Sequence, residues 1–354
     1  MPPFASKKNQ LDLLLEQAVQ HKASDIHILV GRKPIFRIDG VLHEVGDWPI
    51  IQPHLGERLI TEILDEDHYE TLKAERELDI AYEIPAVARF RVNVHWEKNQ
   101  LGLVARVINY DPPTMEQILM PKVVYELTRL RQGLILVTGP TGCGKTTSLA
   151  AMINLINSER SEHIVTLEDP IEFVYTSKKS IIRQRQLGSD FHSFDQALKH
   201  VLRQDPNVIL IGEMRDLETI AAALTIAETG HLVLATLHTL NAAQTVDRII
   251  DVFPPYQQAQ IRLQLSMVLR GVISQQLLSR FEEGRIASRE IMINTPAIAN
   301  LIRENKIPQI KTVIQTSAKE QMTTMDQDLK RLYKGGSINK EVAKQYMLDP
   351  QDIE

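Results

Sequence analysis

One eight-residue segment constrains this chain more than any other. It reads Gly139-Pro140-Thr141-Gly142-Cys143-Gly144-Lys145-Thr146 and matches the P-loop pattern G-x-x-x-x-G-K-[ST] in full. An apolar run, Leu134 to Val137, precedes it, and a helical pattern, Thr146 to Ile156, follows it. In that strand–loop–helix context the glycines let successive backbone N–H groups converge on phosphate oxygens at the positive end of the helix. The segment therefore predicts a nucleotide site.

The residue types within the segment indicate which nucleotide chemistry to expect. Lys145 is expected to neutralise the β- and γ-phosphates, and Thr146 is expected to ligate Mg²⁺. Thr147 follows directly and belongs to the same expected nucleotide site. The expected ligands are therefore ATP and Mg²⁺.

Bulk properties narrow the class of protein. The chain has 354 residues, which is enough for two domains, and one cysteine, which excludes an internal disulfide and a Cys-rich zinc site. A formal net charge of −5 argues against a broad nucleic-acid footprint, so no nucleic-acid partner is expected. No apolar run is long enough to span a bilayer, and the first residues lack the apolar stretch of a secretory signal. A reducing cytoplasm is the expected location.

Residues 1–108 predict a small α+β domain. Asp39-Gly40 joins two short apolar runs as a hairpin turn would. Further along, Phe90 to Trp96 alternates apolar residues with polar ones that include Arg91, and the return strand to Ile108 carries Arg106. Such alternation is typical of antiparallel strands. Residues 109–114 are rich in turn-forming residues and are interpreted as an interdomain linker.

Residues 115–290 alternate short apolar runs with helical patterns. Three further β-branched runs follow the P-loop helix: Ile164 to Leu167, Val208 to Ile211 and Leu232 to Thr236. This predicts an α/β core with a mainly parallel sheet covered by helices. Residues 291–354 are expected to be a helical region, in which Thr295-Pro296 starts a helix and Gly335-Gly336 ends a later one.

Carboxylates follow two of the predicted strands. Glu213 comes after the run Val208 to Ile211, where a Walker B acid would lie beside the metal. By itself it would be better explained as a surface residue, but its position downstream of a P-loop reverses that preference. Glu168, Asp169 and Glu172 surround Pro170 after another run. One of these three carboxylates is expected to be a general base for water, although a solvated acidic loop is the alternative.

Histidines, arginines and the cysteine leave alternatives open. His231 and His238 bracket a buried run and are expected either to reach the γ-phosphate or its metal or to be structural. Arg91 and Arg106 are either an arginine pair for a phosphate or part of a solvated sheet face. The Cys143 thiol is either activated by Lys145 and the helix terminus or buried and inert.

Taken together these segments resemble the secretion and pilus motor ATPases, and within them the PilT-type twitching-motility ATPases, over nearly the whole chain. The matching motifs are Ala23 to His27, the P-loop, Glu168 to Phe173, Ile211 to Thr219, and Gly230 to Thr239. The resemblance implies a PAS-like N-terminal domain, a RecA-like ATPase core and a helical C-terminal region. It also implies that Glu172 is the catalytic glutamate and Glu213 the Walker B acid that completes the metal site with Thr146.

The same resemblance implies a biological setting. Such proteins are homo-hexameric ATPases that retract type IV pili through nucleotide-driven domain movements. They work with an inner-membrane platform protein of the PilC type and with motor paralogues of the PilU or PilB type. The implied location is the cytoplasm, with peripheral association with the inner membrane through the pilus machine. In this setting His231 and His238 are the histidines of the family's His box, and Arg91 and Arg106 are its arginine pair.

One position departs from the family pattern. The C-terminal signature A-I-R-N-L-I-R-E appears here as Ala297 to Glu304, with Ala299 in place of the arginine. This leaves an accessory paralogue as an alternative to a retraction motor. An extension ATPase is a second alternative, although those proteins commonly carry a longer N-terminal region and often a Cys-cluster zinc insert. A subunit that binds ATP and hydrolyses it slowly is a third.

Overall fold

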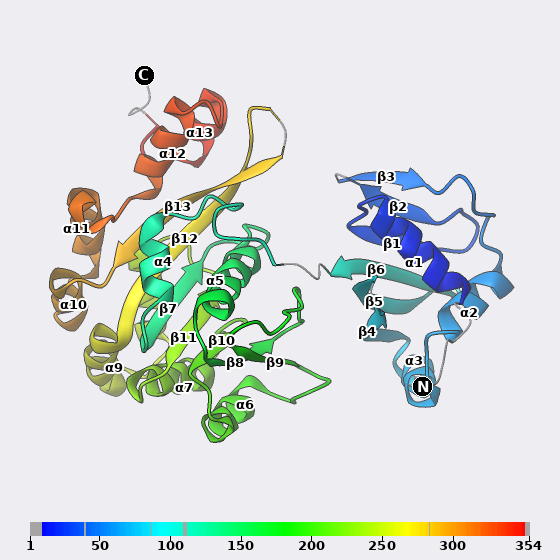
Figure 1. Ribbon diagram of the computed structural model, residues 1–354, viewed down its shortest axis with the longest axis horizontal. Coiled ribbons are helices and arrows are strands. Elements are labelled where there is room, and N and C mark those ends of the chain that lie inside the picture. Colours follow the sequence, from blue (N-terminus) through cyan, green and yellow to red (C-terminus); the bar gives the residue numbers. More distant parts are fainter. Residues whose placement is uncertain (1–8, 39, 86, 109–111, 283, 351–354) are drawn as a thin grey trace. The chain divides into compact units, whose positions relative to one another are not determined.

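The computed structural model of the chain describes residues 9–350, except 39, 86, 109–111 and 283. The chain divides into two compact units, one of residues 1–111 with 172–174 and the other of residues 112–171 with 175–354. Each unit has its own sheet and its own apolar core (Figure 1). The two are described separately below.

The first unit is an antiparallel sheet of six strands in the order β3-β2-β1-β6-β5-β4. Its strands are β1 (Asp25–Ile28), β2 (Ile35–Ile38), β3 (Val41–Glu44), β4 (Glu77–Ile84), β5 (Ala88–Glu97) and β6 (Gln100–Ile108). Its helices are α1 (Gln10–Gln20), α2 (Pro53–Thr61) and α3 (Glu66–Glu75). The buried faces of α1 and α2 pack with one face of the sheet into a single core.

Alternation along β5 gives this sheet two different faces. Phe90, Val92 and Val94 are fully buried, whereas Arg91 between them is exposed. The alternation predicted for Phe90 to Trp96 is therefore confirmed. The sequence analysis did not predict α3. The surface of this helix is mostly charged, and only Leu72 is buried.

The second unit is a sheet of seven strands in the order β13-β12-β7-β11-β10-β8-β9. Only the β12–β13 pair is antiparallel. The strands are β7 (Gly133–Thr138), β8 (His163–Glu168), β9 (Ile181–Gln186), β10 (Val208–Ile211), β11 (Leu232–Leu237), β12 (Leu269–Ser279) and β13 (Arg285–Ile293). The predicted α/β core with a mainly parallel sheet is confirmed.

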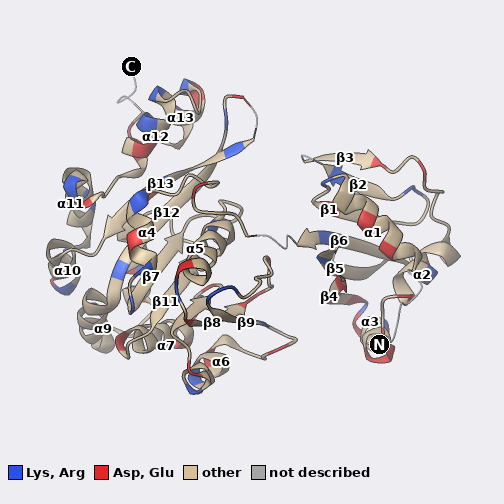
Figure 2. Ribbon diagram, in the orientation of Figure 1, with Lys and Arg blue, Asp and Glu red and all other residues tan. Residues whose placement is uncertain are grey.

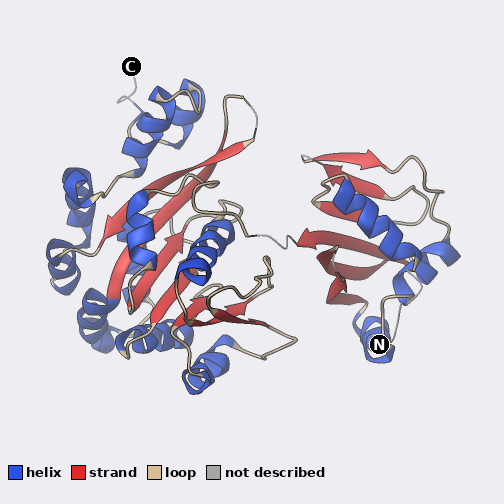
Figure 3. Ribbon diagram, viewed as in Figure 1, coloured by secondary structure: helices blue, strands red, loops and turns tan. Residues whose placement is uncertain are grey.

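Helices cover both faces of this sheet, which is why β7, β10 and β11 are buried along their whole length (Figure 3). One face packs against α4 (Lys122–Thr128) and α5 (Lys145–Glu159). The other packs against a larger set that leads into the C-terminal helices. That set comprises α6 (Phe194–Val201), α7 (Leu217–Glu228), α8 (Ala242–Asp251), α9 (Pro255–Val268), α10 (Pro296–Arg303) and α11 (Ile310–Thr316).

The chain ends in α12 (Met325–Lys334) and α13 (Lys340–Tyr346), which share a small core with the outer part of the β12–β13 hairpin. The predicted helix start is confirmed, because the Thr295 side chain accepts a hydrogen bond from the Ile298 N–H and Pro296 is the first residue of α10. Because β13 continues to Ile293, the expected boundary at 290/291 falls inside a strand. The expected linker lies partly outside the described residues, and residues 112–114 form neither helix nor strand.

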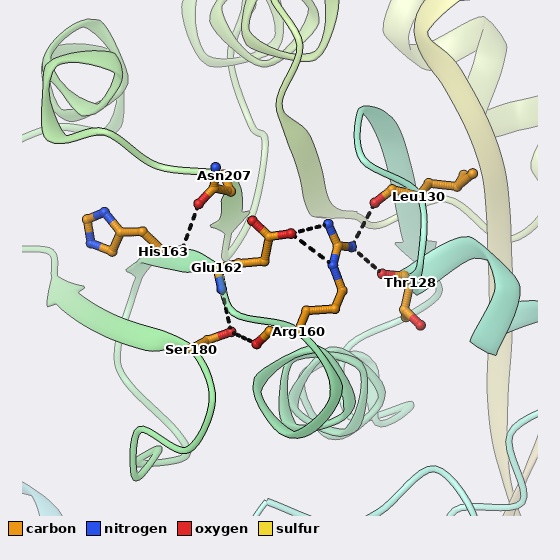
Figure 4. Close-up of polar contacts among 7 residues, drawn as sticks. All are labelled: Thr128, Leu130, Arg160, Glu162, His163, Ser180 and Asn207. Carbon is orange, nitrogen blue, oxygen red and sulfur yellow. Dashed lines mark hydrogen bonds and ion pairs between the residues drawn. The ribbon is translucent and has the colours of Figure 1, made fainter.

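A polar cluster ties together the amino ends of the parallel strands (Figure 4). Arg160, which ends α5, donates to the carbonyl oxygens of Thr128 and Leu130 at 2.9 and 2.8 Å and pairs with Glu162 at 2.8 Å. The Ser180 hydroxyl donates to the Arg160 carbonyl at 2.7 Å and accepts from the Glu162 N–H at 3.2 Å. Charge-assisted bonds of this kind fix the loops at this edge, while the P-loop lies at the opposite edge.

Candidate functional site

The P-loop joins β7 to α5 at the carboxyl edge of the parallel sheet. Gly144 precedes α5 in a left-handed conformation, with φ of 86°, so that the chain can turn sharply into the helix. Gly139 also has a positive φ, and a Cβ there would collide with the Gln275 carbonyl oxygen and lie 2.6 Å from the Cys143 sulfur. The Lys145 ammonium donates to the carbonyl oxygens of Gly139 and Pro140 at 2.8 and 3.1 Å. Lys145 therefore folds back over the P-loop, where it is expected to meet the phosphates of the nucleotide.

A buried glutamine on β12 forms hydrogen bonds with the P-loop and with α5. The Gln275 Nε2 donates to the Cys143 carbonyl at 2.8 Å, and its Oε1 accepts from the Ser148 hydroxyl at 2.8 Å. All three residues are nearly inaccessible to solvent. Sequence reasoning missed Gln275, because the run Leu269 to Ser279 was not recognised as a strand next to the P-loop strand.

Burial of the Cys143 side chain favours the alternative in which the thiol is inert. It is 3 % exposed, and burial raises the pKa of the thiol although the Lys145 ammonium acts in the opposite direction. A raised pKa keeps the thiol neutral and weakly nucleophilic at neutral pH.

Register places Glu213 and His238 at the same edge as the P-loop. Thr138, the last residue of β7, is opposite Leu237, and Ala235 is opposite Ile211 at the end of β10. Since parallel strands share their carboxyl edge, the segments that follow these residues converge. The His238 Nε2 lies 3.6 Å from the Glu213 carboxylate, and Arg215 pairs with that carboxylate at 2.5 Å.

Short backbone contacts fix the position of Glu213. The Gly212 N–H donates to the Leu167 carbonyl at 2.8 Å, and the Met214 N–H donates to the Thr236 carbonyl at 3.1 Å. Glu213 therefore lies between two residues that are bonded to the neighbouring strands on either side. Its side chain is 14 % exposed, while its partner Arg215 is 72 % exposed.

The acidic loop after β8 contains one buried and one exposed glutamate. Glu168 is 5 % exposed and accepts hydrogen bonds from the Thr166 hydroxyl at 2.6 Å and from Gln184 on β9 at 3.1 Å. Glu172 is exposed, beyond Pro170, which follows a cis peptide bond. Glu168 is thus engaged by its neighbours, whereas Glu172 belongs with residues 172–174 to the first unit.

The two histidines do not lie together. His231 precedes Leu232 at the amino end of β11, and its carbonyl accepts from Gly133 at the start of β7. Its ring Nδ1 is 3.2 Å from the Ile226 carbonyl. Because a strand advances about 3.3 Å per residue, the six-residue strand separates His231 from the P-loop edge by about 20 Å. Within this chain His238 thus lies at the P-loop edge and His231 at the other end of β11. A catalytic role for either histidine stays a prediction.

A pocket of about 350 Å³ adjoins the P-loop on the side of the β12–β13 hairpin. Gly144, Thr147 and Ser148 form the P-loop side of its wall. Leu277, Arg280, Arg285, Ile286 and Arg289 line it from the hairpin, and residues 117–119 line it from the chain before α4. Sequence reasoning named none of these wall residues apart from the P-loop itself.

Arg289 is the most unusual residue of this wall. It is 4 % exposed and donates to the carbonyl oxygens of Ile118 and Leu119 at 3.0 and 3.2 Å. Burial lowers the pKa of its guanidinium to about 10, although Asp328 acts in the opposite direction. Its buried Nε has no hydrogen-bond partner among the described residues.

Arg91 and Arg106 lie in the first unit, directly opposite each other on the paired strands β5 and β6. The Arg106 Nε donates to Asp25 at 2.9 Å, and the Arg91 Nε lies 3.9 Å from Asp79. These four residues, with Asn93 and Val104, line a hollow of about 290 Å³. Basic and acidic positions thus occur together on this sheet (Figure 2).

Comparison with known proteins identifies the group to which this architecture belongs. Residues 4–305 match the family model described as type II/IV secretion system protein. The chain belongs to this type II/IV secretion family. The type IV pilus retraction ATPase PilT of Pseudomonas aeruginosa is 44 % identical over 340 residues, which cover 96 % of this chain and 98 % of PilT. A twitching motility protein of Neisseria gonorrhoeae is 45 % identical, covering 94 % of this chain and 89 % of that protein.

Solved structures of secretion-family ATPases have the same fold. A crystal structure of the pilus retraction motor PilT with bound ADP superimposes with a TM-score of 0.92 at 43 % identity, covering 98 % of this chain and 99 % of that one. The ATPase DotB of Legionella pneumophila superimposes with a TM-score of 0.82 at 27 % identity, covering 98 % and 97 %. The expected resemblance to pilus and secretion motor ATPases is confirmed.

Across the part of the chain that is described, no helix is both long enough and apolar enough to cross a membrane. Within the same part, no three His, Cys, Asp or Glu side chains gather into a metal site of their own.

Proposed function

We propose that this protein is an ATP-hydrolysing motor that powers retraction of a type IV pilus. The convergence of the P-loop, Glu213 and His238 at one sheet edge is the observation that carries the proposal. The near full-length relationship to PilT and to a twitching motility protein supports it. Secretion proteins of the E type are more distant, since that of Aeromonas hydrophila is 34 % identical and is covered over only 53 % of its length.

Lys145, Glu172 and His238 each have a proposed part in hydrolysis. Lys145 leaves the carbonyl oxygens of Gly139 and Pro140 to bind the β- and γ-phosphates, and the backbone N–H groups of Gly142 to Thr146 surround them. Glu172 accepts a proton from the attacking water. His238 donates a hydrogen bond toward the γ-phosphate. Chemistry of this kind depends mostly on positioning and on charge stabilisation.

The oxygen donors at this edge fit Mg²⁺, which is a hard cation that prefers oxygen ligands. The Thr146 hydroxyl and the Glu213 carboxylate would hold it. When bound, Mg²⁺ neutralises charge on the β- and γ-phosphates. Arg215, which now pairs with Glu213, is mostly exposed, so releasing that ion pair costs little free energy.

The pocket beside the P-loop accommodates the rest of the nucleotide. It begins at Gly144 and Thr147, where the α-phosphate leaves the loop, and it is lined by apolar Leu277 and Ile286 as well as by arginines. Apolar walls suit a purine ring, and guanidinium groups can stack on it or donate to its ring nitrogens. Arg289 contributes one of these guanidinium groups to the wall.

The assembly that we propose is a homo-hexamer in the cytoplasm, where Arg91 and Arg106 act on a phosphate across a domain or subunit boundary. It would be held at the inner membrane by a platform protein of the PilC type, with a PilU-like or PilB-like paralogue as a second motor. No nucleic-acid partner is proposed. PilU of Pseudomonas aeruginosa is 37 % identical to this chain, and Ala299 departs from the retraction signature, so an accessory motor is the second candidate.

Deleting the gene in its own bacterium separates these functions. A retraction motor predicts that surface motility is lost while surface pili increase, and that Glu172→Gln fails to restore motility. An accessory motor predicts normal pilus numbers with weakened retraction under load. Loss of surface pili would show an extension motor instead and would refute the proposal.

A further inference from the structure

A row of charged side chains crosses the face of the first unit's sheet that is turned away from its core. Register aligns Arg37 on β2, Asp25 on β1, Arg106 on β6 and Arg91 on β5 as successive neighbours. Arginines directly opposite each other repel, so a pair such as Arg91 and Arg106 destabilises the sheet unless something compensates for it. Asp25 thus lies between Arg37 and Arg106, while Arg91, on the next strand, lies 3.9 Å from a second carboxylate, Asp79.

Asp25 differs from its neighbours in being buried. Its side chain is 12 % exposed, whereas that of Arg106 is 68 % exposed. It accepts from the Arg106 Nε at 2.9 Å and from the Ser24 hydroxyl at 2.8 Å, and the Arg37 Nε is 3.9 Å away. Burial tends to raise the pKa of this carboxyl, but the hydrogen bonds from Arg106 and Ser24 outweigh it, and the pKa is lowered. Asp25 is thus a fixed anion at neutral pH.

The way in which Asp25 engages Arg106 determines how that arginine is presented. The carboxylate binds the inner Nε of the guanidinium, and no described residue accepts a hydrogen bond from the two outer Nη groups. The fork of donors that matches a phosphate is therefore left exposed beside Arg91, over the hollow that these residues line.

We propose that Asp25 is a positioning residue, which orients Arg106 so that its outer N–H groups are presented to a phosphate group. This inference rests on the proposed role of the arginine pair in hydrolysis. Asp25 itself does not touch the nucleotide. Its effect is to hold a flexible cation in one direction, because misplacing a group by about 1 Å can reduce a rate about 100-fold.

If Asp25 acts only through its negative charge, the opposite effect on activity is expected. Removing one of the two carboxylates beside these arginines makes the face more positive, and a more positive face attracts ATP more strongly. If Asp25 only reduces the local potential, Asp25→Asn raises activity or leaves it unchanged. If Asp25 positions Arg106, the same substitution lowers turnover while the KM for ATP changes little.

The experiment measures steady-state ATPase activity of the full-length oligomer as a double-mutant cycle of Asp25→Asn and Arg106→Ala. The matched control is Glu44→Gln, which removes a carboxylate on the same sheet whose partner, Arg32, is 2.8 Å away and exposed. We expect Asp25→Asn to lower kcat about 10- to 100-fold and Glu44→Gln to change it less than about 2-fold. In the Arg106→Ala background Asp25→Asn should change kcat less than about 2-fold, because its target is gone.

Size-exclusion chromatography and thermal unfolding of each variant show whether a loss reflects disassembly. Equal losses from Asp25→Asn in both backgrounds, or a normal kcat for Asp25→Asn when Arg106→Ala is impaired, would overturn the inference. Normal turnover in Arg106→Ala would instead refute the proposed role of the arginine pair. The two failures are therefore distinguishable.

Discussion

Replacing Gln275 by leucine tests how the sheet shapes the P-loop. The substitution removes two buried hydrogen bonds and leaves the Cys143 carbonyl and the Ser148 hydroxyl without their partner. Each buried polar group left unsatisfied costs about 1–3 kcal/mol. Ser148 can turn to the Gly144 carbonyl one turn earlier, and leucine buries more apolar surface, so part of this cost is offset. We expect a net destabilisation of about 2–4 kcal/mol.

The same change should weaken nucleotide binding. The Cys143 carbonyl belongs to the peptide whose far side offers Gly144 N–H to phosphate, so releasing it makes the loop less preorganised. We expect ADP affinity to fall about 3- to 10-fold, equivalent to about 1 kcal/mol. Urea unfolding measures the first effect, and titration calorimetry with ADP measures the second.

Gln276, the next residue on β12, supplies the control. Its Oε1 is buried and has no hydrogen-bond partner among the described residues. Gln276→Leu removes an unsatisfied acceptor, so it should leave stability unchanged or raise it slightly. The reasoning is refuted if Gln275→Leu matches the wild type in both assays, or if Gln276→Leu is equally damaging.

Three further outcomes follow from the site. Because burial raises the Cys143 pKa, maleimide should label the folded protein slowly at pH 7 and faster as pH rises toward that pKa, whereas rapid labelling at pH 7 would show an exposed thiolate. His238→Ala should lower ATP turnover at least about 10-fold more than His231→Ala, since only His238 lies at the P-loop edge, and equal rates would contradict this placement. Ala299→Arg, on the half-exposed face of α10, should leave the isolated ATPase rate within about 3-fold of the wild type, and a larger change would place α10 in the catalytic cycle.

Local signals in the sequence were strong where backbone conformation is demanding. The P-loop glycines, the alternation on β5 and the Thr295-Pro296 helix start each reflect a restriction that few residue types satisfy. These features could be predicted because neighbouring residues determine them.

Long-range pairing was harder to foresee. The β12–β13 hairpin carries Gln275 and Arg289, and both act through partners more than 120 positions away along the chain. No local pattern marks a strand whose side chains satisfy a distant loop. The different positions of His231 and His238 were also hard to foresee, because a histidine at each end of a buried strand looks equivalent until the direction of the parallel strands is known.

ATP-dependent phosphate release by the purified wild-type protein, compared with Lys145→Ala, tests the central claim most directly. Lys145 is the only ammonium group contacting the P-loop carbonyl oxygens in the described part of the chain. Loss of this cation should reduce ATP binding and lower kcat/KM by at least about 100-fold. No phosphate release by an intact wild-type oligomer, or equal release by Lys145→Ala, would contradict the account.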